Sequence, residues 1–438
     1  MQIIKDKALL FTADNPEGVT KAIKKSSDVG DNRVLVNWGM TEVHALKDLN
    51  IEAPSPITGR YKWPGQHKPF EHQKTTSAFL TIHKRVFCFN EQGTGKTASA
   101  IWASDFLMAQ GIIRRVLVIC PLSIMDSAWR ADLFTFTMHR SVSIAYGPAK
   151  KREAIIAGGA EYVIINYDGV DIVYDAIAEG GFDLIIADEA THYKNAQTKR
   201  WKTLNKLVKP DTWLWMMTGT PAAQSPVDAY GLAKLVNPKN TPRFYGSFRD
   251  MVMYRISNFK WIPKDSASDT VFDVLQPAIR FTKADCLDLP DMVYTKREVE
   301  LTKQQKKYYN TLKKHMVMQA AGEEITAINA AVNMNKLLQI SCGAIYTDKG
   351  DALEFDVTHR YKVLREVIDE STVVWWGPTS SLETYLQANA RVHRAGQEHK
   401  CTVIQLQGSL IERHVYSLLD NKIDIHTQIL DLYNELLD

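Results

Sequence analysis

One short stretch constrains the fold more than any other feature of this chain. The apolar run Val86–Asn90 is followed by Glu91-Gln-Gly-Thr-Gly-Lys-Thr97 and then by a helical pattern that ends near Gly111. A strand, a glycine-rich loop and a helix in this order are typical of a loop that holds phosphates with backbone N–H groups. The N-terminus of the helix adds partial positive charge. The sequence therefore predicts a phosphate-binding α/β domain.

Within this loop, the residue types match the roles needed to bind ATP and magnesium. Gly93 and Gly95 permit a tight turn of the backbone, and Thr94 stands between them in the same cofactor-binding loop. We expect Lys96 to hold the β- and γ-phosphates and the Thr97 hydroxyl to ligate magnesium. The alternative is a glycine-rich turn that binds no ligand.

A second apolar strand, Leu184–Ala187, ends in two carboxylates, Asp188 and Glu189. We expect Asp188 to hold magnesium and Glu189 to orient the attacking water, because phosphoryl transfer depends on positioning and charge stabilisation. Alone, an Asp-Glu pair at the end of a strand is equally compatible with an ordinary surface. Its place after Lys96, in the same expected sheet, favours the catalytic interpretation.

Residues 60–240 alternate short β-branched runs with helical patterns. Continuously apolar strands are buried on both faces, as in a parallel sheet covered by helices, so we expect a doubly wound α/β domain. The expected strands are Val86–Asn90, Val116–Cys120, Val142–Tyr146, Tyr162–Tyr167, Leu184–Ala187 and Trp213–Thr218.

The rest of the chain suggests three further parts. Residues 1–50 resemble a small α/β accessory domain, and residues 51–240 contain the expected ATP-binding domain. Residues 241–357 have few strand runs and are predicted to form a mostly helical linker or insertion, with helices at 302–321 and 327–340. Residues 358–438 return to an α/β pattern, with strands at 372–376 and 401–407.

Composition excludes several classes of protein. Apolar residues make up 45% and charged residues 24%, which is ordinary for a globular protein and excludes a disordered or collagen-like chain. The net charge of +3 means that any nucleic-acid site must come from local clustering of basic residues. The five cysteines form no CxxC pair, no apolar run reaches the length of a membrane span, and the N-terminus lacks a signal-peptide layout. We therefore expect a cytoplasmic protein without a membrane partner.

The stretch Gln387–Gln397 reads Gln-Ala-Asn-Ala-Arg-Val-His-Arg-Ala-Gly-Gln. On a helix, Arg391 and Arg394 share one face and can reach one target. Guanidinium groups are always charged and can stabilise the charge that develops during phosphoryl transfer, as an arginine finger does. The alternative is a solvated basic helix.

Taken in order, these motifs resemble the motif series of superfamily-two helicases, specifically the SNF-type, remodeller-like branch and its compact phage-encoded members. The resemblance covers roughly residues 60–420 and implies two RecA-like lobes. It makes Gln73, in Lys68-Pro-Phe-Glu-His-Gln73, the expected adenine contact. Gln387–Gln397 matches motif VI, which assigns Gln387 to catalysis together with Arg391 and Arg394.

The same resemblance implies where nucleic acid binds. Motifs Ia and Ib are resembled by Ile119–Trp129 and Ile164–Tyr167. Motif II is matched by Asp188–Asn195, and motif III by Thr218–Pro221. Taken alone, Thr218–Pro221 is equally compatible with a plain strand and turn. The residues expected to contact nucleic acid are Pro121, Ser123, Asn166, Thr218 and Lys194. Further basic candidates, each compatible with a solvated surface, are Lys199, Arg200, Lys202, Lys303, Lys306 and Lys307. Trp129 is expected to pack in the core.

The chain departs from the family pattern in several places. Thr191 stands where the family usually has His, and Asn90 replaces a usual acidic residue. The junction Glu370–Thr372 runs directly into a strand where the family has motifs IV and V. The second RecA-like lobe is therefore expected to be truncated.

The leading hypothesis is an ATP-dependent DNA helicase or translocase that acts as a nucleic-acid-stimulated ATPase. We expect a monomer that contacts the backbone of duplex DNA independently of sequence. The alternative is an ATP- and DNA-binding module that does not translocate because motifs IV and V are absent. An RNA helicase is disfavoured by the form of motif VI, and a P-loop kinase or transporter ATPase does not explain Gln387–Gln397.

Overall fold

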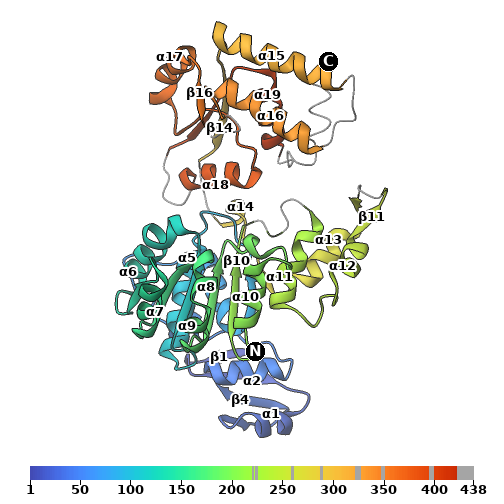
Figure 1. The fold of residues 1–438 in the computed structure, drawn as a ribbon. Coiled ribbons are helices and arrows are strands. Elements are labelled where there is room, and N and C mark those ends of the chain that lie inside the picture. Colours follow the sequence, from blue (N-terminus) through green and yellow to red (C-terminus); the bar gives the residue numbers. More distant parts are fainter. Residues whose placement is uncertain are drawn as a thin grey trace. The chain divides into compact units, whose positions relative to one another are not determined.

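The computed structural model describes residues 1–219, 221, 225–257, 261–286, 290–320, 327–346, 351–393 and 399–421. The chain divides into two compact units, Met1–Cys286 and Leu287–Asp438 (Figure 1). The boundary falls inside the predicted linker 241–357, so this segment is shared between the two units. The finer division into four parts stays a prediction.

A seven-stranded parallel sheet forms the centre of the first unit. Every pairing in it is parallel, which confirms the predicted α/β fold with a RecA-like sheet. In spatial order the strands are β13 (Ala278–Ile279), β5 (Arg85–Cys88), β10 (Trp213–Met217), β9 (Leu184–Asp188), β6 (Val116–Cys120), β8 (Tyr162–Asn166) and β7 (Val142–Ile144). All six predicted strands are confirmed. The two-residue strand β13 was not predicted, because it is too short to produce an apolar pattern.

Both faces of this sheet are buried, which explains the continuously apolar strands. In β10, Trp213, Trp215 and Met217 pack into one hydrophobic cluster, whereas Leu214 and Met216 pack into another. This alternation follows from the two-residue period of a strand. Helices cover the sheet: α3 (Ile57–Arg60), α4 (Glu71–Ile82), α5 (Lys96–Ala109), α6 (Ala131–Thr137), α7 (Ala149–Ala157), α8 (Tyr167–Ile172), α9 (Tyr174–Glu179), α10 (Lys199–Leu207) and α11 (Ala229–Val236).

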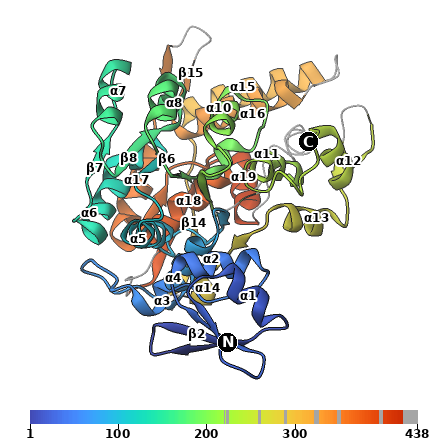
Figure 2. The same cartoon turned by 90° about the horizontal axis from the view of Figure 1, so that it is seen from below.

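The N-terminal residues form a small antiparallel sheet of the order β1-β2-β4-β3. Its strands are β1 (Gln2–Ile4), β2 (Ala8–Thr12), β3 (Ser26–Asp28) and β4 (Arg33–Asn37), and its helices are α1 (Pro16–Ala22) and α2 (Met40–Asp48). Helix α1 begins at Pro16, because Asn15 Oδ1 accepts the Gly18 N–H at 2.9 Å and Pro16 occupies the first turn. Helix α2 contacts α4, as Figure 2 shows.

Residues 241–286 complete the first unit. They form α12 (Tyr245–Val252), the hairpin β11 (Met253–Arg255) and β12 (Trp261–Pro263), α13 (Ala267–Val274), and α14 (Lys283–Cys286) after strand β13. Phe248, Val252 and Val274 pack into the hydrophobic cluster on one face of the central sheet. This part of the predicted linker is therefore an extension of the first unit.

The second unit is built on a three-stranded parallel sheet of the order β14-β18-β17. The strands are β14 (Met292–Glu298), β17 (Val373–Trp375) and β18 (Cys401–Gln407). Around them lie α15 (Lys303–Ala320), α16 (Ala327–Cys342), the hairpin β15 (Ala344–Tyr346) and β16 (Ala352–Glu354), α17 (Thr358–Val367), α18 (Leu382–Val392) and α19 (Leu410–Asp420). Strand β14 was not predicted, because it lies at the sheet edge with mostly exposed side chains.

A buried ion pair joins the two sides of the Glu370–Thr372 junction. Arg360 Nη2 lies 2.7 Å from Glu412 Oε1, and their side chains are 2% and 0% exposed. The other carboxylate oxygen of Glu412 accepts the N–H groups of Gly408 and Ser409 at 2.7 and 3.0 Å, which caps α19. Arg360 also donates to the carbonyl of Trp376. The pair therefore fastens α17 to the start of α19.

Candidate nucleotide-binding site

The loop between β5 and α5 has the backbone conformation that a phosphate-binding loop requires. Gly93 and Gly95 have φ values of 86° and 82°, in the left-handed region that favours glycine. A β-carbon at Gly95 would lie 2.1 Å from Nε2 of Gln73, so the Gln73 side chain would have to move to admit it. Lys96 begins α5, and its Nζ donates to the carbonyl of Asn90 at 2.8 Å. Thr97 follows Lys96 and is half-buried.

Helix α4 supports this loop from the side. Gln73 Oε1 accepts the Phe70 N–H at 3.0 Å, and Gln73 Nε2 donates to the carbonyl of Thr94 at 3.2 Å. His72 Nε2 lies 2.8 Å from the same carbonyl. The side chain of Gln73 is thus placed against the phosphate loop, while its expected contact with adenine stays a prediction.

Asn90 and Glu91, at the base of the loop, bind the chain that follows β13. Asn90 Oδ1 accepts the Phe281 N–H at 3.0 Å, and Asn90 Nδ2 donates to Thr76 Oγ1 at 2.8 Å. Glu91 Oε2 accepts the Lys283 N–H at 2.9 Å. The amide of Asn90 supplies both a donor and an acceptor, which an ionised acidic residue at this position could not do.

The two carboxylates predicted from the strand pattern lie at the carboxyl end of β9. Asp188 Oδ2 accepts the Trp129 Nε1–H at 2.8 Å, and Asp188 Oδ1 accepts the Glu189 N–H at 3.0 Å. Burial raises the pKa of Asp188, and the Trp129 hydrogen bond and the charge of Lys96 oppose that rise. The positive charge of Lys96 thus favours the ionised form of Asp188.

The order of the strands brings Thr218 to the carboxyl end of β9, beside the two carboxylates. Strand β10 lies between β5 and β9, and the Thr218 N–H after it donates to the carbonyl of Cys88 at 3.1 Å. Thr218 Oγ1 donates to Glu189 Oε1 at 2.9 Å, and Thr191 Oγ1 lies 3.4 Å from the same oxygen. Glu189 itself has a φ of 52°, which turns the chain sharply after the strand. Thr218 is fully buried, and its contact with nucleic acid stays a prediction.

The other residues predicted to contact nucleic acid lie at the carboxyl end of β8 and after β6 and β9. Pro121 and Ser123 follow β6, with Ser123 exposed. Asn166 Oδ1 accepts a hydrogen bond from Arg152 Nη1 at 2.9 Å, and Lys194 Nζ lies 3.2 Å from Asp228 Oδ2. Their contact with nucleic acid stays a prediction.

Several of the further basic candidates also pair within the chain. Lys199 lies 3.9 Å from Asp171 and Arg200 lies 2.8 Å from Asp168. Lys306 lies 2.5 Å from Glu300. Surface pairs of this kind contribute little to stability, so these side chains could exchange their partners for phosphates at small cost.

Motif VI lies in the second unit. Helix α18 carries the half-buried Gln387 and the exposed Arg391, and Arg394 lies outside the described residues. Trp375 Nε1 donates to Asn389 Oδ1 at 2.9 Å, which anchors α18 to strand β17. The assignment of Gln387, Arg391 and Arg394 to catalysis stays a prediction.

Two residues at the site were not recognised from the sequence. Trp129 is fully buried, which confirms its predicted packing, but it also binds Asp188. Tyr167, directly after β8, donates its hydroxyl hydrogen to the carbonyl of Asp188. No local pattern indicates these contacts, because they depend on which strands become neighbours.

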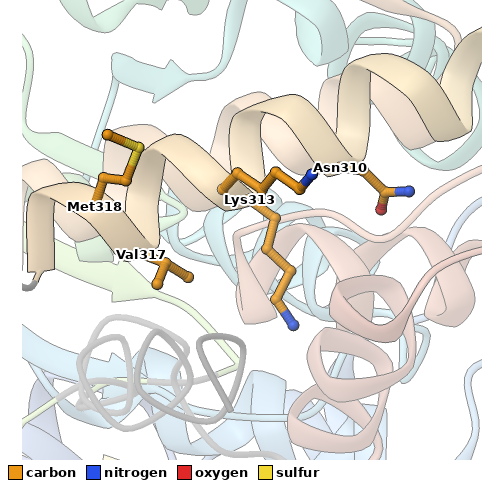
Figure 3. Close-up of a pocket in the computed structure, with 5 residues that line it drawn as sticks. Asn310, Lys313, Val317 and Met318 are labelled. Atoms are coloured by element: carbon orange, nitrogen blue, oxygen red, sulfur yellow. The ribbon is translucent and has the colours of Figure 1, made fainter.

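A surface hollow lies beside α15 in the second unit (Figure 3). It is lined by Asn310, Lys313, Lys314, Val317 and Met318, which all belong to one helix. Because no second element supplies converging polar groups, this hollow carries no functional assignment.

Among the described residues, none of the helices combines the length and the apolar character that a membrane span needs.

Among known proteins, relatives come from phages, bacteria and eukaryotes. The chain is 27% identical over 323 residues to putative protein p41 of Acyrthosiphon pisum secondary endosymbiont phage 1, covering 69% of each chain. It is 25% identical over 238 residues to the putative ATP-dependent helicase/translocase YwqA of Bacillus subtilis, covering 51% of this chain and 24% of the relative. It is 24% identical to a Caenorhabditis elegans SWI/SNF-related regulator of chromatin, subfamily A-like protein 1 homolog, covering 40% of this chain and 25% of the relative. The chain thus spans about a quarter of the length of the last two.

Among solved structures, the Sulfolobus solfataricus SWI2/SNF2 ATPase core in complex with dsDNA aligns with a TM-score of 0.47 and 19% identity, covering 86% of this chain and 97% of that chain. The SNF2-related domain family matches residues 72–344, which begin at helix α4 beside the phosphate loop and continue into the second unit. This match covers more than half of the chain and includes Gln73, the phosphate loop, the two carboxylates after β9 and Thr218. The phosphate loop, the carboxylates and the threonine that binds Glu189 thus lie within one recognised domain, and the chain belongs to the SNF2-related family of helicase-like proteins.

Proposed function

We propose that this chain is an ATP-dependent DNA translocase, which hydrolyses ATP when it is bound to DNA. The observation that carries the proposal is the cluster at the carboxyl edge of the sheet. Lys96 follows β5 through the glycine loop, Asp188 ends β9 on the far side of β10, and Glu189, the next residue, accepts a hydrogen bond from Thr218. A cation, a metal-binding carboxylate and a held carboxylate base are the groups that phosphoryl transfer needs.

The residues present fit ATP and magnesium. The left-handed glycines Gly93 and Gly95 leave the loop backbone free to approach phosphates, and Lys96 follows at the N-terminus of α5. Magnesium prefers oxygen ligands and is usually bound through one or two carboxylates together with phosphates, and Asp188 and Thr97 supply such oxygens. When bound, the ion neutralises charge on the transferring phosphoryl group.

Glu189 is proposed to orient the attacking water. Its carboxylate is held by Thr218, so the side chain does not need to search for its position when ATP binds. Arg391 and Arg394 are proposed to act as arginine fingers from the second unit, as their motif implies.

The proposed partner is duplex DNA, bound through its phosphates. Ser123 follows β6, Asn166 is the last residue of β8 and Lys194 follows β9, and these strands belong to the same sheet as the ATP site. A translocase must grip every sequence equally, which phosphate contacts allow because they carry no base information.

A phosphate-release assay with and without duplex DNA tests this proposal. DNA should increase hydrolysis by the parent protein, and Lys96→Ala and Glu189→Gln should each abolish it. Lys239→Ala, which changes an exposed lysine outside the site, should retain the parent rate. If Lys96→Ala or Glu189→Gln hydrolysed ATP at the parent rate, the assignment of the site would be wrong.

One observation favours a second candidate, an ATP- and DNA-binding module that does not translocate. The described part of the second unit contains a parallel sheet of three strands, fewer than the seven of the first unit. Displacement of the third strand from a DNA triplex separates the two candidates: a translocase displaces it with ATP, and a binding module does not. Replacing DNA by RNA in the hydrolysis assay tests whether the chain is instead an RNA helicase.

A further inference from the structure

Trp129 contacts the carboxylate that is proposed to hold magnesium. Its indole Nε1–H donates to Asp188 Oδ2 at 2.8 Å, while the Glu189 N–H donates to the other oxygen, Oδ1, at 3.0 Å. Each oxygen of the carboxylate thus has one protein donor. A carboxylate oxygen has two lone pairs, so both oxygens can still bind a metal ion or its water.

The sheet explains how a residue so distant in sequence reaches Asp188. Strand β6 is the direct neighbour of β9, with Ile119 paired to Ala187, so the chain that leaves β6 passes the end of β9. This chain forms a π-helix, Met125–Arg130, before it continues as α6. π-Helical turns are rare and frequently occur at functional sites.

The indole of Trp129 is also rigidly held. Its side chain is 0% exposed and packs in the hydrophobic cluster that contains Met125, Leu133, Cys120 and Ile164. Close packing within this cluster leaves the indole ring little freedom to rotate. The N–H group is therefore fixed in place and aimed at Asp188.

We propose that Trp129 is a positioning residue for the magnesium site: its indole N–H fixes the orientation of the Asp188 carboxylate. This inference rests on the proposed function, because it assumes that Asp188 binds magnesium together with ATP. Groups that orient a metal-binding carboxylate commonly affect metal affinity about 10- to 100-fold when they are removed.

The experiment measures magnesium dependence of nucleotide binding rather than turnover. Binding of a fluorescent mant-ATP is followed by anisotropy, with direct excitation of the mant group, at increasing Mg²⁺ concentration. In Trp129→Phe, the Mg²⁺ concentration at half-saturation should rise about tenfold. Binding in EDTA, which reports the phosphate loop without metal, should not change.

Trp102 offers a matched control. Trp102 is 1% exposed, and its Nε1–H donates to the carbonyl of Pro64 at 3.0 Å. Trp102→Phe therefore also removes a buried indole and its hydrogen bond, and its Mg²⁺ dependence should equal that of the parent protein. An unchanged half-saturation in Trp129→Phe, or an equal rise in both variants, would overturn the positioning role.

A second variant separates the hydrogen bond from the shape of the side chain. Benzothienylalanine at position 129 replaces the indole N–H by sulfur and keeps the ring volume, so the core remains filled. It should reproduce the magnesium defect of Trp129→Phe; normal magnesium dependence would overturn the inference. If the parent protein itself bound no mant-ATP with magnesium, the proposed function would fail first, and that outcome is visible before any variant is compared.

Discussion

Thr218 Oγ1 donates a hydrogen bond to Glu189 Oε1 at 2.9 Å, joining the threonine after β10 to the proposed base after β9. The two residues belong to different motifs and are brought together because β10 and β9 are neighbours in the sheet. The usual histidine of the family is replaced here by Thr191, whose hydroxyl lies farther from the same oxygen, at 3.4 Å. The Thr218 contact is therefore shorter than the Thr191 contact.

Thr218→Val tests this contact, because valine keeps the shape of threonine and removes the hydroxyl. We expect kcat to fall about 10- to 100-fold, since a hydrogen bond to a charged group contributes about 1.5–3 kcal/mol. Binding of ATP should not change, because the phosphate loop is untouched. Thr191→Val, which loses the longer contact, should lower kcat less; an equal or larger effect would contradict the prediction.

Gly95→Ala should abolish nucleotide binding. The φ of 82° strains any residue with a β-carbon, and that carbon would also meet Gln73 at 2.1 Å. Gly111→Ala is the matched control: Gly111 has a φ of 69° but no atom near its β-carbon position. The control should cost about 1–2 kcal/mol of stability from backbone strain alone and should keep ATP binding, as measured by calorimetry and thermal unfolding.

Arg391→Ala tests the predicted arginine finger. Loss of such a residue lowers kcat by about 10³- to 10⁵-fold in related chemistry, because the guanidinium acts on charge that develops only in the transition state. Binding of ATP should change little. Arg413→Ala, which removes an exposed arginine paired with Glu298 in the same unit, is the control and should leave kcat unchanged.

Arg360→Met should destabilise the second unit. It leaves the carboxylate of Glu412 buried without its 2.7 Å partner, and breaking a buried ion pair on one side costs about 3–5 kcal/mol. Denaturant unfolding of the full chain measures the change. The double variant Arg360→Met/Glu412→Gln should recover part of the loss, because it removes the unpaired charge; no recovery would show that the ion pair is not the cause.

Much of the first unit could be predicted from local patterns. Continuous apolar runs such as Val116–Cys120 indicate strands that are buried on both faces. The strand–glycine–helix pattern places Lys96 at a helix N-terminus, independently of how the rest of the domain packs. Strands β13 and β14 could not be predicted from the sequence, for a physical reason. One has two residues, and the other exposes most of its side chains, so neither leaves an apolar signal.

The sequence by itself determined the order of motifs, the strands of the central sheet and the residues of the phosphate loop. These properties depend on local burial and backbone geometry, which each segment carries within itself. Only the tertiary structure decided that β10 lies between β5 and β9, and that β6 lies on the other side of β9. Those neighbours place Thr218 on Glu189 and Trp129 on Asp188. Strand pairing is chosen by the packing of the whole sheet, so no local pattern contains it.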